Sequence, residues 1–314
     1  MNRLALLVLK LQSFATRASY LRRERRLARS ASESRALDIL FSRRDPWEAP
    51  IRGGFEGLAH RLVFADIATS DLERFDLIVP LSLADIGHVR AQGAHLQARV
   101  VPLPDPACSA LCHDKPRLNQ HLIDAGFGLH VPAMGTDVPP PYFCKPARGE
   151  NSDDCTLVPD RATELRLGPA LTRTDLFRQA AVPGEIEYAT HFLMRDGMLA
   201  RELTVRYHYD APMFIKGAAR AGMQARTLGP CPDAGVLLSL LAAIGYDGLG
   251  CANYKMDRGV LKVIEINPRM GGSLGDYFFS FLRSMPSIQR SVRRGCTNWT
   301  WLDSAADRPS IRGS

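Results

Sequence analysis

The segment 250–273 constrains the fold of this chain more than any other stretch. It predicts two short strands joined by a tight turn at residues 257–259, Asp-Arg-Gly, which is typical of a β-hairpin. Because side chains alternate along a strand, Glu265 and Asn267 are expected on one face of the second strand, residues 260–267. Strict alternation places two apolar residues on that same face, Leu261 and Val263. Carboxylate and amide oxygens a few ångströms apart are suited to Mg²⁺ that carries a bound phosphate.

Arg269 follows on the same parity, just past the strand, where a planar guanidinium can bind an anion through two hydrogen bonds. The glycine-rich run 271–273 allows the backbone to turn closely around that point. The whole stretch resembles the last core motif of the ATP-grasp ligases. The resemblance implies that Glu265 and Asn267 hold Mg-ATP and that Arg269 is catalytic, steadying the charged reaction intermediate. The alternative is an ordinary hairpin with exposed polar residues.

Asn253 is a departure from the pattern of that family. Counting back along the paired strand, the resemblance places the first metal carboxylate of the family at this position. An amide oxygen can bind Mg²⁺ but brings no negative charge. Three alternatives stay open: one metal is held weakly, another acid such as Asp257 substitutes, or the protein binds nucleotide without catalysis.

Two lysines precede this motif in the order that the resemblance requires. Asp114 can cap a helix that begins at Lys115, and Lys145 follows a short apolar strand that leads into a loop with Gly149 and Ser152. Flexible loops with free N–H groups suit phosphates, and the chain has no Walker A loop. The resemblance implies that both lysines, Gly149 and Ser152 contact ATP. The alternative for the loop is a surface turn with one extended lysine.

Residues 176–197 read as a strand, a Pro-Gly turn and a second strand. In ATP-grasp enzymes this region holds adenine at the hinge and ribose on the following strand. The resemblance therefore implies nucleotide contacts for Gln179 and Glu187, although Ala180 replaces the acidic residue often found beside the hinge glutamine. Glu187 could instead be an ordinary exposed carboxylate.

Residues 198–230 are rich in basic and aromatic side chains, and they are expected to line the substrate side of the site. Within them, Arg220 is the candidate for binding a substrate carboxylate. A solvated cationic face is an equally good interpretation.

The composition bounds these hypotheses. The 314 residues are enough for two domains, and the net charge of +7 owes much to arginines before residue 53. A solvated, partly disordered basic arm is favoured over an organelle transit peptide or a surface for nucleic acid or acidic lipid. The seven scattered cysteines do not form a disulfide framework, so free thiols in a cytoplasmic protein are expected. The apolar run 4–9 is too short to span a membrane.

The resemblance implies an α+β fold: an ATP-grasp two-lobed nucleotide clamp behind a small α/β domain. For that small domain, strands are expected at 62–65, 76–81 and 99–103 and a helix at 83–92. The expected division is a basic arm (1–35), a small α/β domain (36–110), a first lobe (111–175), a second lobe with the metal site (176–300) and a loose tail (301–314).

The same resemblance implies an ADP-forming ligase that uses ATP and Mg²⁺. It would activate a small-molecule carboxylate as an acylphosphate for attack by an amine. Bicarbonate activation with carbamoyl transfer is the first alternative, and a non-catalytic nucleotide-binding protein is the second. Nucleic acid is not expected as a partner, whereas an oligomer is compatible with the sequence.

Overall fold

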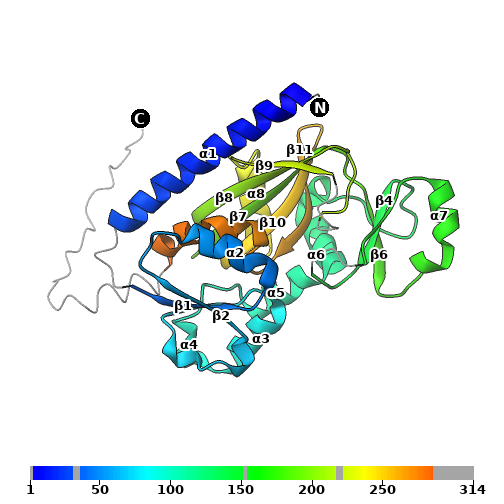
Figure 1. The fold of residues 1–314 in the computed structure, drawn as a ribbon. Helices are drawn as coiled ribbons and strands as arrows, with labels where there is room; N and C mark the ends of the chain where they lie inside the picture. Colours follow the sequence, from blue (N-terminus) through cyan, green and yellow to red (C-terminus); the bar gives the residue numbers. More distant parts are fainter. Residues whose placement is uncertain (1–2, 31–35, 151–153, 217–221, 286–314) are drawn as a thin grey trace, which may run out of the picture.

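The computed structural model describes residues 3–30, 36–150, 154–216 and 222–285 (Figure 1). Ser152, Arg220 and the expected tail 301–314 lie outside the described residues. Within them the chain forms three sheets, called below the sheet of the small domain, the sheet of the smaller lobe and the large sheet. Residues 176–180 pair in the sheet of the smaller lobe, although the expected division placed them in the second lobe. None of the helices in these ranges combines the length and apolarity that a membrane-spanning helix requires.

The first sheet is parallel, with strand order β2-β1-β3. Its strands are β1 (Asp38–Ser42), β2 (Arg61–Ala65) and β3 (Leu77–Val79). Its helices are α2 (Asp45–Gly54), α3 (Leu83–Ala91) and α4 (Ala94–Gln97). The central strand β1 was not expected from the sequence, whereas the strand expected at 99–103 contributes only a bridge from Val100 to Ile78. Ser82 caps α3 together with Asp85, which fixes the helix start where the sequence predicted it.

The small domain is completed by a segment that follows the strand 260–267, where the metal site was expected. Residues Gly272–Ser284 form the 3₁₀ segment η6, which packs against α2 and β1. Phe278 is fully buried there, with its ring 5.3 Å from that of Phe41 in an edge-on arrangement. The domain therefore extends beyond the expected range 36–110, because its core needs apolar side chains from the far end of the chain.

The second sheet is antiparallel, with order β5-β4-β6, and forms the smaller lobe. Its elements are β4 (Tyr142–Pro146), β5 (Thr156–Val158), α7 (Arg161–Leu167) and β6 (Leu176–Ala180). Helices α5 (Pro106–His113) and α6 (Lys115–Leu122) precede it, and Asp114 caps α6 as expected. In Figure 1 this lobe stands apart from the large sheet, with α6 between them. Short single turns complete the elements: η1 (Ile67–Thr69), η2 (Leu72–Arg74), η3 (Ile123–Phe127), η4 (Gly128–His130) and η5 (Gly168–Leu171).

The third sheet has five antiparallel strands in the order β11-β10-β7-β8-β9. Its elements are β7 (Ile186–Arg195), β8 (Met198–Tyr209), β9 (Met223–Gly229), α8 (Ala234–Ala243), β10 (Gly248–Asp257) and β11 (Val260–Asn267). Alternate side chains such as Phe192 and Tyr254 pack in one core with α8. The intervening residues, among them Glu187 and Asn253, face the opposite side and line a cavity. The turn between β10 and β11 is the expected one, with positive φ at Arg258 and Gly259.

Strand β11 does not alternate strictly, and this corrects one expectation. The pairing shifts so that Asn253 lies opposite Glu265 while Tyr254 lies opposite Val263, which leaves Ile264 as the extra residue of a β-bulge. Leu261 and Val263 therefore point into the core with α8, not to the face of Glu265. Glu265 and Asn267 still share a face because the bulge precedes both of them.

The N-terminal arm is also different from expectation. Residues Arg3–Ser30 form the helix α1, which packs along β9 and η6 and is not a loose segment (Figure 1). The carboxylate of Glu24 is 2 % exposed and accepts ion pairs from Arg201 and Arg283, both at 2.7 Å. The buried ion pairs and the packing along β9 fix the helix on the sheet. The cysteines at the six described positions are free thiols, as expected.

Candidate functional site

One cavity brings together most of the residues singled out from the sequence. It lies between the small antiparallel sheet and the face of β10 and β11 that is turned away from α8. Its lining includes Lys115, Lys145, Gly149, Gln179, Glu187, Asn253 and Glu265. These residues come from five strands, one helix and one loop, so only the tertiary fold could gather them. Four lysines and three glutamates line the cavity, which gives it an excess of positive charge suited to an anion.

The two predicted phosphate-binding lysines reach the cavity from separate elements. Lys115 at the start of α6 donates to the backbone carbonyl of Gly149 at 3.0 Å, which ties the helix to the loop after β4. Lys145 on β4 is buried and donates to Oε1 of Gln179 at 2.7 Å. Burial lowers the pKa of Lys145 to about 8, although the negative charge of Glu265 opposes this shift. Gln179 therefore lies beside this lysine, and its Nε2 has no hydrogen-bond partner among the described residues.

Glu265 is hydrogen-bonded to both Asn253 and Asn267. Oε1 of Glu265 accepts from Nδ2 of Asn253 at 2.6 Å and from Nδ2 of Asn267 at 3.0 Å. Burial alone would raise the pKa of Glu265, but Lys145, Lys115 and the two amide donors hold it below its usual value. The carboxylate is therefore charged at neutral pH.

The carboxylate and amide oxygens of these three side chains fit a Mg²⁺ ion that obtains its remaining ligands from phosphate and water. Glu265 and Asn267 are the better-placed pair, because the oxygen of Asn253 already accepts from Lys216. Across the part of the chain that the structure describes, there is no group of three or more His, Cys, Asp or Glu side chains that could hold a metal ion. A site with one carboxylate is consistent with a metal held mainly through a nucleotide.

Lys216 is a site residue that the sequence analysis did not select. Its Nζ donates to Asn253 at 2.9 Å and pairs with the buried carboxylate of Glu187 at 2.8 Å. Burial alone would lower the pKa of Lys216, but the charge of Glu187 raises it. Lys216 belongs to the basic region 198–230, so composition marked the region without marking this residue. The ion pair places Glu187 inside the cavity, not on an exposed face.

Lys255 is a second cavity residue that the sequence did not single out. From β10 its Nζ donates to three backbone carbonyls at 2.8–3.1 Å, those of Val182, Gly184 and Pro212. Burial lowers the pKa of Lys255 to about 8. It fixes the turn between β6 and β7, which is the hinge where the adenine contact was expected.

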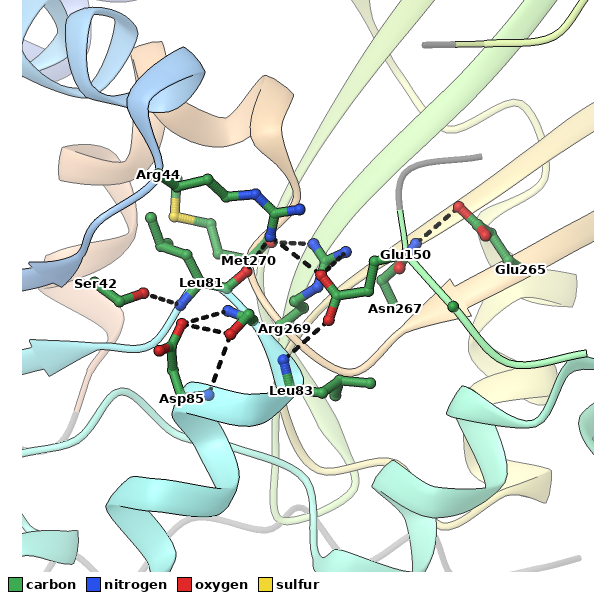
Figure 2. Close-up of polar contacts among 12 residues, drawn as sticks. Ser42, Arg44, Leu81, Leu83, Asp85, Glu150, Glu265, Asn267, Arg269 and Met270 are labelled. Atoms are coloured by element: carbon green, nitrogen blue, oxygen red, sulfur yellow. Dashed lines mark hydrogen bonds and ion pairs between the residues drawn. The ribbon is translucent and has the colours of Figure 1, made fainter. Parts of the chain in front are cut away.

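Arg269 is buried at the end of β11 and meets a carboxylate (Figure 2). Its Nη2 lies 3.1 Å from Oε2 of Glu150, a residue of the loop after β4. Asp276, a nearby acid that could have paired with this arginine, instead pairs with Arg17 at 3.0 Å. Glu150 also contacts Arg44, which follows β1. The negative charge of Glu150, which would repel a phosphate group, is therefore offset by two arginines.

The glycines after Arg269 permit the close packing expected of them. A Cβ atom at Gly272 would lie 2.8 Å from the ring of Trp47, and one at Gly271 would lie 2.7 Å from the ring of His191. A larger side chain at Gly272 would push the Arg269 turn away from α2 of the small domain, and one at Gly271 would push it away from β7 of the large sheet. The predicted nucleotide, metal and arginine positions that the structure describes thus lie in and beside one cavity.

Comparisons with known proteins support this architecture. No family model matches the chain, and no curated protein matches it by sequence. Among solved structures, D-alanine–D-alanine ligase from Bacillus anthracis matches 82 % of this chain and 98 % of its own, with a TM-score of 0.54 at 16 % identity. The same enzyme complexed with ATP matches 84 % of this chain and 100 % of its own, with a TM-score of 0.53 at 13 % identity.

An L-amino acid ligase from Bacillus licheniformis is also similar. It matches over 79 % of this chain and 70 % of its own length, with a TM-score of 0.54 at 14 % identity. At these identities the comparison concerns the fold. The chain has the ATP-grasp fold, as its motifs indicated.

Proposed function

Given the ATP-grasp fold, we propose that the protein is an ATP-dependent, ADP-forming ligase that joins a small carboxylate to an amine. The observation that carries this proposal is the convergence of Lys115, Lys145 and Glu265 on one cavity, with Arg269 paired to the cavity residue Glu150. Solved structures of similar fold are named as ligases, and one of them is described as complexed with ATP.

Each of these residues has a chemical task in such a reaction. Lys115 and Lys145 offset the negative charge of the ATP phosphates from two sides, and Glu265 with Asn267 holds the metal. When bound, Mg-ATP supplies the phosphoryl group that turns a carboxylate into an acylphosphate, which an amine can attack. Arg269 has a planar, permanently charged guanidinium. It would stabilise the negative charge that develops on the transferred phosphoryl group and on the attacked carbonyl.

Pairing in the cavity positions these side chains before a ligand binds. Lys216 holds both Glu187 and Asn253, and Asn253 in turn holds Glu265. A site whose polar groups are already oriented needs little reorganisation during the reaction. Glu187 is proposed for ribose, and the hinge fixed by Lys255 is proposed for adenine.

The test is a screen for phosphate and ADP release with pools of small carboxylates combined with pools of amines. Phosphate release that requires a carboxylate and an amine together supports the ligase, and Glu265→Gln serves as the inactive control. Release that depends on bicarbonate would favour the carbamoyl alternative. Mg-ATP binding without release in any pool would favour a non-catalytic nucleotide-binding protein.

A further inference from the structure

The carboxylate of Glu150 is held by groups from three distant parts of the chain (Figure 2). Its Oε2 lies 3.1 Å from Nη1 of Arg44 and 3.1 Å from Nη2 of Arg269. Its Oε1 accepts from the backbone N–H of Leu83 at 3.0 Å, at the first residue of α3. We call Arg44, Arg269 and the Leu83 N–H the carboxylate cradle.

The cradle matches the shape of a carboxylate. Both oxygens of one planar group are bound, one by two guanidinium groups and the other by a backbone donor. Arg269 is 6 % exposed and Arg44 is 17 % exposed, so both interactions are shielded from water. Trp47 of α2 packs beside both arginines, with their Cζ atoms 4.3 Å and 5.6 Å from its ring.

The charges of the cradle exceed those of its occupant. Two permanently charged guanidinium groups of the cradle face the single carboxylate of Glu150. Burial alone would raise the pKa of Glu150, but Arg269, the Leu83 N–H and Arg44 lower it. Removing Glu150 would leave two arginines without its charge in a shielded position, which favours the entry of another anion.

The cradle lies next to β11, the strand that carries the proposed metal ligands. Arg269 is two residues beyond Asn267, and Glu150 itself lines the cavity that contains Glu265. An external carboxylate that took the place of Glu150 would lie at the end of the cavity where the two lobes and the small domain meet.

We propose that the carboxylate cradle is the subsite for a substrate carboxylate, and that Glu150 fills it in the unliganded protein as a tethered competitor. The assignment to the substrate rests on the proposed ligase function. The specific claims are that Arg44 and the Leu83 N–H, not Arg269 alone, bind the substrate carboxylate, and that Glu150 must be displaced for it to bind. When a side chain of the protein itself occupies a site most of the time, only a fraction of the molecules can bind an external ligand. The apparent affinity for that ligand is reduced by this fraction.

Trp47 provides a direct reporter of the cradle. The chain has three tryptophans, at positions 47, 299 and 301. In a parent variant carrying Trp299→Phe and Trp301→Phe, emission comes from Trp47 alone, and a change in the stacked arginines should alter it. The parent is titrated with sodium acetate at constant ionic strength, without nucleotide or Mg²⁺. Inorganic phosphate is the parallel probe for a tetrahedral anion.

Adding Glu150→Gln to the parent should tighten acetate binding by about tenfold or more, because the competing charge is gone. Adding Arg44→Met as well should abolish that gain, whereas the matched control Arg43→Met, at an exposed neighbouring position, should keep it. Melting temperatures of all variants are measured alongside, so that a variant that fails to fold is recognised and replaced by Arg44→Lys.

Equal acetate affinity with and without Glu150, together with a lower melting temperature for Glu150→Gln, would show that Glu150 is only a structural contact. Binding of phosphate but not acetate would also overturn the carboxylate assignment. Because the titration contains no ATP, its result is independent of the ligase screen. Tight acetate binding with no phosphate release in that screen would refute the proposed ligase function and leave the cradle as a carboxylate site.

Discussion

At the scale of single residues, the cavity depends on side chains whose charge is changed by burial. Burial lowers the pKa of Lys145 to about 8, so in the unliganded protein its ammonium loses its proton as the pH rises through 8. Bound phosphate stabilises the charged form. Mg-ATP binding should therefore take up a proton near pH 8, and the affinity should fall at higher pH.

Lys145→Arg tests whether the proton taken up near pH 8 binds to Lys145, because a guanidinium stays charged throughout this pH range. The variant should bind Mg-ATP without the proton uptake, measured by calorimetry in buffers that differ in ionisation enthalpy. Unchanged proton uptake in Lys145→Arg would assign the titration to another group. Lys255 is the first to examine, since its pKa is also lowered to about 8 by burial.

Lys115 is expected to contribute to nucleotide affinity through one charge-assisted hydrogen bond. Lys115→Met should weaken Mg-ATP binding by about 1.5–3 kcal/mol, measured by calorimetry at neutral pH. Arg117→Met, two residues along the same helix, is the matched control and should bind normally. An unchanged affinity in Lys115→Met would mean that the lysine serves only to hold the Gly149 loop.

Arg269 is expected to act on the reaction more than on ATP binding. Lysine lacks the planar fork, so Arg269→Lys should lower turnover sharply and leave the Mg-ATP affinity nearly unchanged. Turnover is measured with the substrates found in the phosphate-release screen, and stability is measured in parallel. A variant that keeps its turnover rate but has a lower melting temperature would show that Arg269 only stabilises the structure through Glu150. The catalytic role would then be wrong.

At the scale of elements, α1 is fixed to the large sheet by a buried carboxylate. Glu24 meets Arg201 and Arg283 at 2.7 Å, and its side chain is 2 % exposed. Glu24→Gln leaves both guanidinium groups without that charge, and the free energy of unfolding should fall by about 3 kcal/mol. Chemical denaturation measures it.

Glu56→Gln is the control for Glu24. The side chain of Glu56 is 80 % exposed, and its carboxylate lies as far as 3.8 Å from the guanidinium of Arg25. That exposed pair should contribute almost nothing. Equal stability of Glu24→Gln and the unmodified protein would show that other contacts of α1 hold it on the sheet. A truncation near Ser34 would remove α1, and it is expected to destabilise the large sheet.

The β-bulge in β11 is the other element-scale feature that determines the site. If Ile264 were paired regularly and not bulged, side chains would alternate strictly along the strand, and Leu261 and Val263 would share a face with Glu265. The bulge allows one short strand to supply apolar side chains to the core and polar ones to the cavity.

At the scale of the whole molecule, Mg-ATP should stabilise the fold by joining the two lobes. At about 100 times its dissociation constant, a ligand that binds only the native state adds about 2.7 kcal/mol to the free energy of unfolding. We expect Mg-ATP to raise the melting temperature, EDTA to remove most of the rise, and Glu265→Gln to respond little to Mg²⁺. An equal rise with ATP in EDTA would argue against a metal at Glu265.

Local patterns determined much of this protein. The order of the motifs, the cap at Asp114, the Arg258-Gly259 turn and the shared face of Glu265 and Asn267 could all be read from residues close together in sequence. They are predictable because capping, turn conformation and the spacing of two residues on a strand depend on covalent geometry over a few positions.

Contacts between distant residues were decided by the tertiary structure. Lys216 meets Asn253 across 37 positions, and Arg44 meets Glu150 across 106. Such pairs depend on how the sheets pack and on which long side chains the packing shields from water. For the same reason the sequence marked a basic region and an arginine-rich arm, whereas only the fold selected Lys216 for the cavity and buried Glu24 of α1 against Arg201 and Arg283.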